Sequence, residues 1–351
     1  MKNKSIKVLL VIVIVIIALG AGVVIWYTFS SRSGHDSLEA GVDVEIPIIE
    51  QNEELTEKET AKWQEGWVKY NGEIYQYKKD VMTFLLMGTD QTGKNTAQSG
   101  SLDGGQADVQ VLVVLDFDEK RIELIPINRN TMVDVDVYDE LGNVIRTQKA
   151  QIAVQHGVGN GMEESCEYQV KAVSRFLFQI PIYGYASMSL EGLAPLSNAI
   201  GGVDVTVPAD ELTEGLSFHK GETIHLSGNE ALNFVRERDH DVGGADRRLE
   251  RQKVFMKALI SRVLKSIKED PKSVISIYSS AAKYMTTDID TNEMIYLAGK
   301  SASLRYDGSS MHSIAGETVR GEDFDEFYAD ETALKELILN IFYEKIEIDN
   351  G

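Results

Sequence analysis

Two long apolar runs, 81–87 and 108–117, restrict the fold of this chain more than any other feature. Neither run alternates regularly with polar residues, as a strand with one solvated face would, so we predict two strands buried on both faces. A third strand, 121–127, follows across a tight turn at 118–120. A sheet that is buried on both faces needs helices on both sides. The runs therefore indicate an α/β fold, a three-layer α/β/α arrangement with a central mixed β-sheet.

Segments with helical and extended spacing alternate along the rest of the chain. Helices are predicted at 162–178, 191–200, 229–234, 246–268, 271–284, 291–303 and 331–344, and further strands at 183–190, 203–207 and 309–315. We assign 81–268 to a central domain and 269–351 to a C-terminal helical part of the same domain. Ahead of them, 63–80 carries alternating aromatic and β-branched residues around Asn71-Gly72, which predicts a β-hairpin.

The N-terminus predicts one transmembrane helix that acts as a signal anchor. Residues 8–30 carry no charge, and a helix of this length, at about 1.5 Å per residue, spans about 34 Å, enough to cross a bilayer core. The lysines within 1–7 outnumber Arg32, which alone follows closely, and this favours a cytoplasmic N-terminus and an extracytoplasmic globular domain. A cleaved signal peptide is the alternative, but the run exceeds the usual apolar region of about 7–15 residues. The acidic, polar stretch 31–62 is expected to be an extracytoplasmic stalk.

Charge and cysteine content exclude some classes of protein. The formal net charge is −20 at pH 7, which excludes broad nucleic-acid binding because that requires a basic face. The single cysteine, Cys166, allows no intramolecular disulfide, so a large core must stabilise the domain. Against this acidic background, five arginines fall within 234–252. Arginine presents a rigid fork of donors that matches phosphate oxygens, although a solvated helix surface with Asp246 and Glu250 as ion-pair partners is the alternative.

Polar residues stand next to the predicted buried strands. Asp90 follows the first strand, Asp108 begins the second and Arg129 follows the third. Ligands of α/β proteins collect where loops leave the strand ends. Two carboxylates can hold Mg²⁺ while arginine binds phosphate oxygens, which is a common arrangement for phosphoryl transfer. Each aspartate alone is more often a turn residue or a helix cap.

The order of these motifs resembles that of the LytR-CpsA-Psr family of cell-envelope proteins. A strand that ends in G-T-D is followed by A-D, N-R-N-T, I-G-G-V, R-E-R and D-R-R-L-E-R-Q, and the resemblance covers about 84–263. It implies that 81–268 is the catalytic domain of a membrane phosphotransferase. Such an enzyme moves a glycopolymer, for example teichoic acid or capsular polysaccharide, from a polyprenyl-pyrophosphate carrier to peptidoglycan and leaves a phosphodiester. The resemblance also implies Mg²⁺ or Mn²⁺ as the cofactor and an apolar pocket for the polyprenyl chain.

The family's site residues can be placed on this sequence motif by motif. The resemblance puts the catalytic and metal-binding carboxylates on Asp90 and Asp108, and a catalytic arginine that also binds pyrophosphate on Arg129. The other pyrophosphate-binding positions are Gln106, Arg236, Arg238, Arg248, Arg251 and Gln252.

Three positions depart from the family's usual pattern. Gln106 stands where an arginine is usual, and Asn130 replaces an aspartate. An aspartate is usual three residues before Arg248, but Ala245 occupies that position and Asp246 lies one residue late. A neutral amide binds phosphate less strongly than a guanidinium does. Two other functions therefore stay open, a module that binds polyprenyl phosphate or pyrophosphate without transfer, and a polyprenyl-pyrophosphate hydrolase.

Overall fold

The computed structural model describes residues 37–38, 47–49, 54–91, 104–139, 141–212, 217–236, 244–269, 273–301, 303–307 and 309–347. The predicted cytoplasmic segment 1–7 and the predicted anchor 8–30 lie outside these residues. Among the helices that are described, none combines the length and the apolar character needed to cross a membrane.

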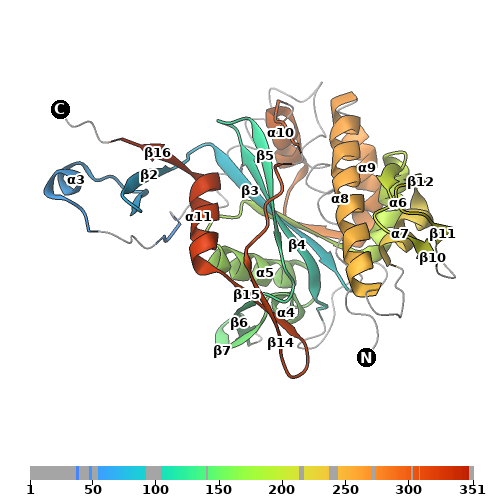
Figure 1. The fold of residues 1–351 in the computed structure, drawn as a ribbon, viewed down its shortest axis with the longest axis horizontal. Helices are drawn as coiled ribbons and strands as arrows, with labels where there is room; N and C mark the ends of the chain where they lie inside the picture. Colours follow the sequence, from blue (N-terminus) through green and yellow to red (C-terminus); the bar gives the residue numbers. More distant parts are fainter. Residues whose placement is uncertain are drawn as a thin grey trace.

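A five-stranded mixed sheet forms the centre of the structure (Figure 1). Its strands, in spatial order, are β13 (Met285–Thr287), β8 (Gly184–Ser189), β3 (Val81–Thr89), β4 (Ala107–Asp116) and β5 (Arg121–Ile127). Strands β3 and β8 run parallel, and the other neighbours are antiparallel. The predicted mixed α/β fold with a central mixed sheet is therefore confirmed.

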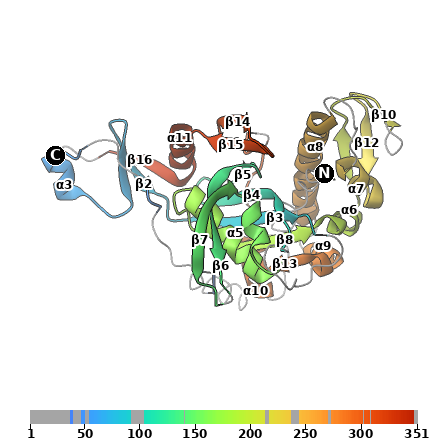
Figure 2. The same cartoon turned by 90° about the horizontal axis from the view of Figure 1, so that it is seen from below.

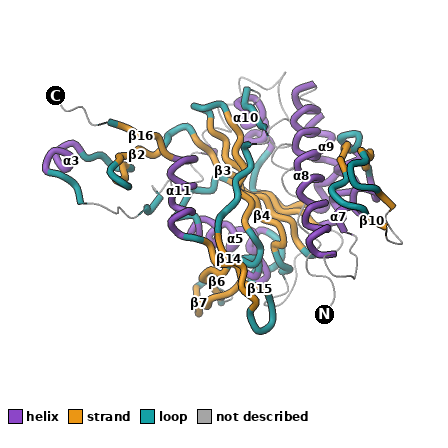
Figure 3. The backbone as a smooth tube through the Cα atoms, viewed as in Figure 1, coloured by secondary structure: helices purple, strands orange, loops and turns teal. Residues whose placement is uncertain are grey.

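Burial of the two central strands is complete. Every residue of β3 and of β4 is buried, as the unbroken apolar runs predict. Figure 2 shows helix α5 (Glu163–Phe176) on one side of the sheet and helices α8 (Gly244–Glu269) and α11 (Glu331–Phe342) on the other. Figure 3 shows the same arrangement, with the strands at the centre and helices around them.

Shorter elements complete the domain. The other helices among the described residues are α3 (Glu57–Lys62), α4 (Val154–Gly157), α6 (Leu193–Ala199), α7 (Gly228–Arg236), α9 (Ser273–Ala281) and α10 (Thr291–Ser301), with 3₁₀ turns η1 (Leu190–Gly192) and η2 (Ala282–Tyr284). Strand β9 (Val203–Thr206) pairs with β12 (Thr223–Leu226), and β10 (Glu211–Leu212) pairs with β11 (Ser217–Phe218).

The predicted hairpin within 63–80 is present. Strands β1 (Trp67–Tyr70) and β2 (Glu73–Tyr77) pair in antiparallel register across Asn71 and Gly72. Both turn residues have positive φ, 50° and 78°, as a two-residue type I′ turn requires. The last strand that the structure describes, β16 (Tyr343–Ile346), adds to the other edge of β2 and makes a three-stranded sheet.

Besides the β10–β11 pair, two longer hairpins among the described residues were not predicted. Strands β6 (Met132–Tyr138) and β7 (Val144–Gln151) form an antiparallel ribbon, and β14 (Gly316–Arg320) pairs with β15 (Asp325–Ala329). The C-terminal part 269–351 is thus not only helical, because it also supplies β13 to the central sheet and β16 to the N-terminal sheet. The strand predicted at 309–315 is wrong, since Met311 forms only an isolated bridge with Leu124.

Parts of the predicted stalk 31–62 pack against the domain. Leu38 and Ile49 are buried in the hydrophobic core, with 2% and 6% of their surfaces exposed. The Ser37 hydroxyl donates to Glu293 Oε1 on α10 at 2.7 Å. Burial of isolated apolar side chains thus fastens a segment whose average composition is polar.

The β6–β7 ribbon is fixed to helices α4 and α5 by polar and aromatic contacts. Asp136 on β6 forms an ion pair with Arg175 of α5. The side chain of Gln155 bonds both backbone groups of Asp136, at 2.9 Å each. The rings of Tyr138 and Tyr168 stack with their centroids 3.7 Å apart and 9° between their planes.

Removal of the Asp136–Arg175 ion pair by Arg175→Ala should lower the free energy of unfolding by about 1–3 kcal/mol at pH 7. The hydrogen bond from Arg175 holds the pKa of Asp136 below its ordinary value of 3.8. A carboxyl with a lowered pKa stabilises the fold above its unfolded-state pKa, and this contribution is lost as pH falls through the folded-state value. Urea unfolding should therefore show that the difference in free energy of unfolding between the wild type and Arg175→Ala shrinks below about pH 4.

A matched control is Lys149→Ala, which removes an ion pair with Asp134 on the same ribbon. Both of those side chains are exposed, at 68% and 48%, so the loss should stay below about 1 kcal/mol. Equal losses for the two variants would contradict a specific role of the Asp136–Arg175 ion pair in fixing the ribbon.

Candidate active site

A β-bulge places the first carboxylate of the candidate site. At the end of the β3–β4 pair, Gly88 is opposite Val109 whereas Thr89 is opposite Ala107, so Asp108 is the extra residue on β4. The Asp108 side chain is fully buried, with 0% of its surface exposed. Bulges often lie next to active sites because they redirect a side chain.

Four of the predicted residues meet at these strand ends. Asp90 Oδ1 accepts from the backbone N–H of Gln106 at 2.6 Å, and the Asp90 N–H donates to the Gln106 carbonyl at 3.1 Å. Arg129 forms an ion pair with Asp108 through Nη1 and donates from Nη2 to Gln106 Oε1 at 2.5 Å. We call Asp90, Gln106, Asp108 and Arg129 the strand-end cluster.

Gln106 gives the strand-end cluster a neutral acceptor beside Arg129. The resemblance implies that position 106 contacts pyrophosphate, and in this structure its side-chain oxygen accepts from Arg129 instead. An arginine at this position would bring a second positive charge against Arg129, which is unfavourable unless an anion lies between them. Gln106 and Asp108 together therefore orient the Arg129 guanidinium.

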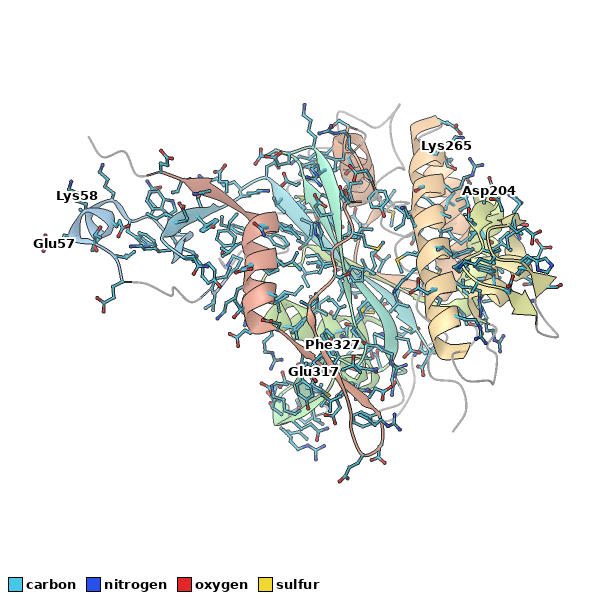
Figure 4. The ribbon with its side chains drawn as sticks, viewed as in Figure 1. Glu57, Lys58, Asp204, Lys265, Glu317 and Phe327 are labelled. Carbon is cyan, nitrogen blue, oxygen red and sulfur yellow. The ribbon has the colours of Figure 1, made fainter. Side chains whose placement is uncertain are left out.

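Asn130, the second departure from the family pattern, links two hairpins. Its side-chain oxygen accepts from Gln151 Nε2 at 2.8 Å, and the same nitrogen donates to the carbonyl of Asp325 at 2.9 Å. The backbone N–H of Phe327, labelled in Figure 4, donates to the Asn130 carbonyl at 2.9 Å. Residue 130 therefore joins the β6–β7 ribbon to β15 directly after Arg129.

Arg251 and Gln252 bond the backbone of α7. Each is buried, with 1% of its surface exposed. Arg251 Nε donates to the carbonyl of Phe234 at 2.9 Å, and Gln252 Nε2 donates to that of Val235 at 3.1 Å. These bonds satisfy carbonyls in the last turn of α7 and fasten α8 to it. A role in pyrophosphate binding stays a prediction for both residues.

The remaining arginines are only partly placed. Arg236 is exposed at the last position of α7. Arg238 lies outside the described residues, and α8 contains Arg248 without its side chain being described. Convergence of these arginines on the strand-end cluster therefore stays a prediction.

His156 and Gln91 hold the loop that precedes Gln106, and neither was identified from the sequence. His156 Nδ1 lies 3.0 Å from the carbonyl oxygens of both Gly104 and Gly105, just before Gln106. Gln91 Nε2 donates to the same Gly104 carbonyl at 2.9 Å. Neither residue belongs to a local motif, because each partner lies at least 13 positions away along the chain. Only the Gly104-Gly105 pair could have signalled a tightly packed loop.

The carboxylates offer a limited set of metal ligands. Within the described part of the chain, no group of three or more His, Cys, Asp or Glu side chains is placed to hold a metal ion. Asp90 and Asp108 nevertheless belong to one hydrogen-bonded cluster. Mg²⁺ usually binds one or two carboxylates and completes its shell with water and phosphate oxygens. The donor set therefore fits Mg²⁺ in the presence of a phosphate-bearing ligand.

The mixed sheet and the strand-end cluster define an α/β protein whose candidate site combines two carboxylates with arginine. The LytR_cpsA_psr family model matches residues 48–340, and the chain belongs to this family.

Two relatives and a solved structure support this assignment. The chain is 30% identical over 258 residues to TagV of Bacillus subtilis, a polyisoprenyl-teichoic acid–peptidoglycan teichoic acid transferase, with 72% of this chain and 59% of that protein covered. It is 27% identical over 220 residues to TagU of Enterococcus faecalis, a transferase described in the same words, with 63% and 65% covered. The crystal structure of B. subtilis TagV gives a TM-score of 0.53 at 26% identity and covers 75% of this chain and 96% of that one. The chain thus spans less than two thirds of the length of the two relatives.

Breaking the Asp108–Arg129 ion pair should destabilise the fold. Arg129→Met is expected to lower the free energy of unfolding by about 3 kcal/mol, because it removes the guanidinium partner of a buried carboxylate. Asp108→Asn in the same background should recover part of this loss. Urea unfolding of the wild type, both single variants and the double variant measures the coupling between the two side chains. Strictly additive losses would mean that they do not interact.

Proposed function

We propose that this protein transfers a glycopolymer from a polyprenyl-pyrophosphate carrier to peptidoglycan and forms a phosphodiester. The observation that carries the proposal is the strand-end cluster, which holds Arg129 between Asp108 and Gln106 beside Asp90. Family membership and the names of the TagV and TagU relatives support the same reaction and the same two partners.

The reaction needs a charged site for a pyrophosphate. A sugar hydroxyl of peptidoglycan would attack the phosphorus that carries the glycopolymer. The bond from this phosphorus to the bridging oxygen would break, and polyprenyl phosphate would leave with that oxygen. The hydroxyl proton would pass to a base, for which Asp90 is the candidate in the strand-end cluster. Such reactions depend mainly on positioning and on stabilising charge on the phosphate oxygens.

Arg129 is suited to that stabilisation. Its guanidinium is already oriented by two side chains, and 16% of its side-chain surface is exposed, so it can meet a ligand without a large rearrangement. Asp90 and Asp108 would hold Mg²⁺ or Mn²⁺, which when bound would neutralise charge on the phosphate oxygens. Asp90→Ala or Asp108→Ala should then weaken the dependence of transfer on the metal.

A membrane location follows from the proposed substrate. A polyprenyl-pyrophosphate carrier is confined to the bilayer, so residues 8–30 are proposed to anchor the chain as a single-pass helix with its N-terminus in the cytoplasm. The globular domain would then lie outside the cytoplasm, next to the peptidoglycan.

The decisive assay uses the full chain in detergent or vesicles with a lipid-linked oligosaccharide, Mg²⁺ and a peptidoglycan acceptor. Transfer predicts a product that joins the two by a phosphodiester and releases polyprenyl phosphate. Release of a phosphosugar without the acceptor would support a hydrolase instead. Binding without turnover under Mg²⁺ and Mn²⁺ would support a binding module.

Arginines of 234–252 are expected to bind the pyrophosphate of the carrier. Arg236→Ala and Arg238→Ala should each weaken binding of a polyprenyl-pyrophosphate analogue by about 1.5–3 kcal/mol, the usual contribution of a hydrogen bond to a charged group. Arg121→Ala is the control, because Arg121 pairs with Glu123 at the end of β5 opposite to Arg129. Unchanged binding by the Arg236/Arg238 double variant would remove these residues from the site.

Gln106→Arg tests the first departure from the family pattern. Without ligand, the variant should melt at a lower temperature than the wild type, because it replaces the bond to Arg129 with charge repulsion. Pyrophosphate should stabilise Gln106→Arg more than the wild type, since an anion can bridge two guanidiniums. Gln106→Met is the matched control, which loses the same bond and adds no charge. If pyrophosphate stabilised Gln106→Arg and Gln106→Met equally, position 106 would not face the ligand.

A further inference from the structure

The loop that leads into β4 is packed too tightly for side chains. A Cβ atom at Gly104 would lie 2.6 Å from both Gly159 O and Ser165 Oγ. Gly105 has a φ of +73°, and a Cβ atom there would lie 2.8 Å from Asp90 Oδ1. Both positions therefore require glycine, one for space and the other also for its backbone conformation. The loop is held between Asp90 on one side and the start of α5 on the other.

His156 on α4 holds the same loop through its backbone. The ring is fully buried, with 0% of its surface exposed, and Nδ1 lies 3.0 Å from the carbonyl oxygens of Gly104 and Gly105. Carbonyl oxygens only accept, so Nδ1 must carry the proton. Nε2 faces Cys166 Sγ at 3.9 Å, and burial lowers the pKa of His156, which favours the neutral ring. The side chain is therefore a neutral donor to two successive carbonyls.

The held loop continues directly into the strand-end cluster. Gln106 follows Gly105, and its backbone N–H donates to Asp90 while its side-chain oxygen accepts from Arg129. The Ala107 N–H donates to the Ala153 carbonyl at 3.2 Å, immediately before α4. A shift of the Gly104-Gly105 backbone would thus move the partners of both Asp90 and Arg129.

We propose that His156 is a positioning residue of the candidate active site, because its Nδ1–H fixes the Gly104-Gly105 backbone and thereby sets Gln106 between Asp90 and Arg129. His156 acts through this backbone and not on the reacting atoms. The expected effect on turnover rests on the proposed transferase function, whereas the expected effect on the loop does not.

Two substitutions that match each other in shape, made in the full chain, isolate the contribution of the Nδ1–H donor. His156→Asn keeps an N–H group near the position of Nδ1. His156→Leu introduces a side chain of nearly the same shape as asparagine, but without a donor. Hydrogen–deuterium exchange should show amides of 104–108 exchanging roughly fivefold to tenfold faster in His156→Leu, the effect of one lost hydrogen bond, while amides of β5 and α11 are unchanged. Transfer should show a kcat lower by about the same factor with KM nearly unchanged. His156→Asn should resemble the wild type in both measurements.

The controls separate the possible failures. If the wild type transfers nothing, the transferase proposal fails while the exchange comparison still tests the positioning role. Wild-type exchange in a folded His156→Leu protein would overturn the proposal. Equal changes in the Asn and Leu variants would also overturn it, because the volume of the ring would then hold the loop. If His156→Leu does not fold, His156→Gln replaces it, since its donor lies nearer the position of Nε2 and should not restore the loop.

Discussion

The pairing of β3 with β4 is the interaction on which the rest of the structure depends. Both strands are buried along their whole length, and β8 and β5 add to their outer edges. The register shift at the end of this pair puts Asp108 inside the protein. A buried carboxylate needs a partner of opposite charge, and Arg129, two residues beyond β5, supplies it. The sheet that forms the core thus also determines which side chains must meet at its end.

Much of the fold, and the strand-end placement of part of the candidate site, could be predicted from the sequence. Unbroken apolar runs identify β3 and β4 because burial on both faces removes polar alternation. Asp90, Asp108 and Arg129 follow from the same runs, since a strand that is placed correctly also places the residues at its ends. The Asn71-Gly72 turn was equally clear, because few sequences tolerate two successive positive φ angles.

Other features depend on contacts that no local pattern records. Val133 and Val135 alternate with aspartates, a pattern that is typical of a strand and could have predicted β6. The attachment of the β6–β7 ribbon could not be predicted in this way, because it depends on Arg175, 39 positions from Asp136. His156 meets Gly104 across 52 positions and belongs to no motif. The partner of Arg251 could not be predicted for a different reason. A guanidinium can donate to a phosphate oxygen or to a helix carbonyl, and only the structure shows that Arg251 donates to the Phe234 carbonyl.

The three-stranded sheet at the N-terminal side has a consequence for how the domain forms. Strand β16, the last element described, pairs with β2 so that Tyr343 lies opposite Tyr77 and Ile346 opposite Ile74. Contacts between residues so far apart in sequence raise the contact order, which slows folding. A ribosome makes the chain from its N-terminus, so the outer edge of β2 stays open until residues 343–346 have been synthesised. An open strand edge is a template for wrong pairing, so loss of residues 343–346 would both weaken the finished domain and lengthen the time during which it can aggregate.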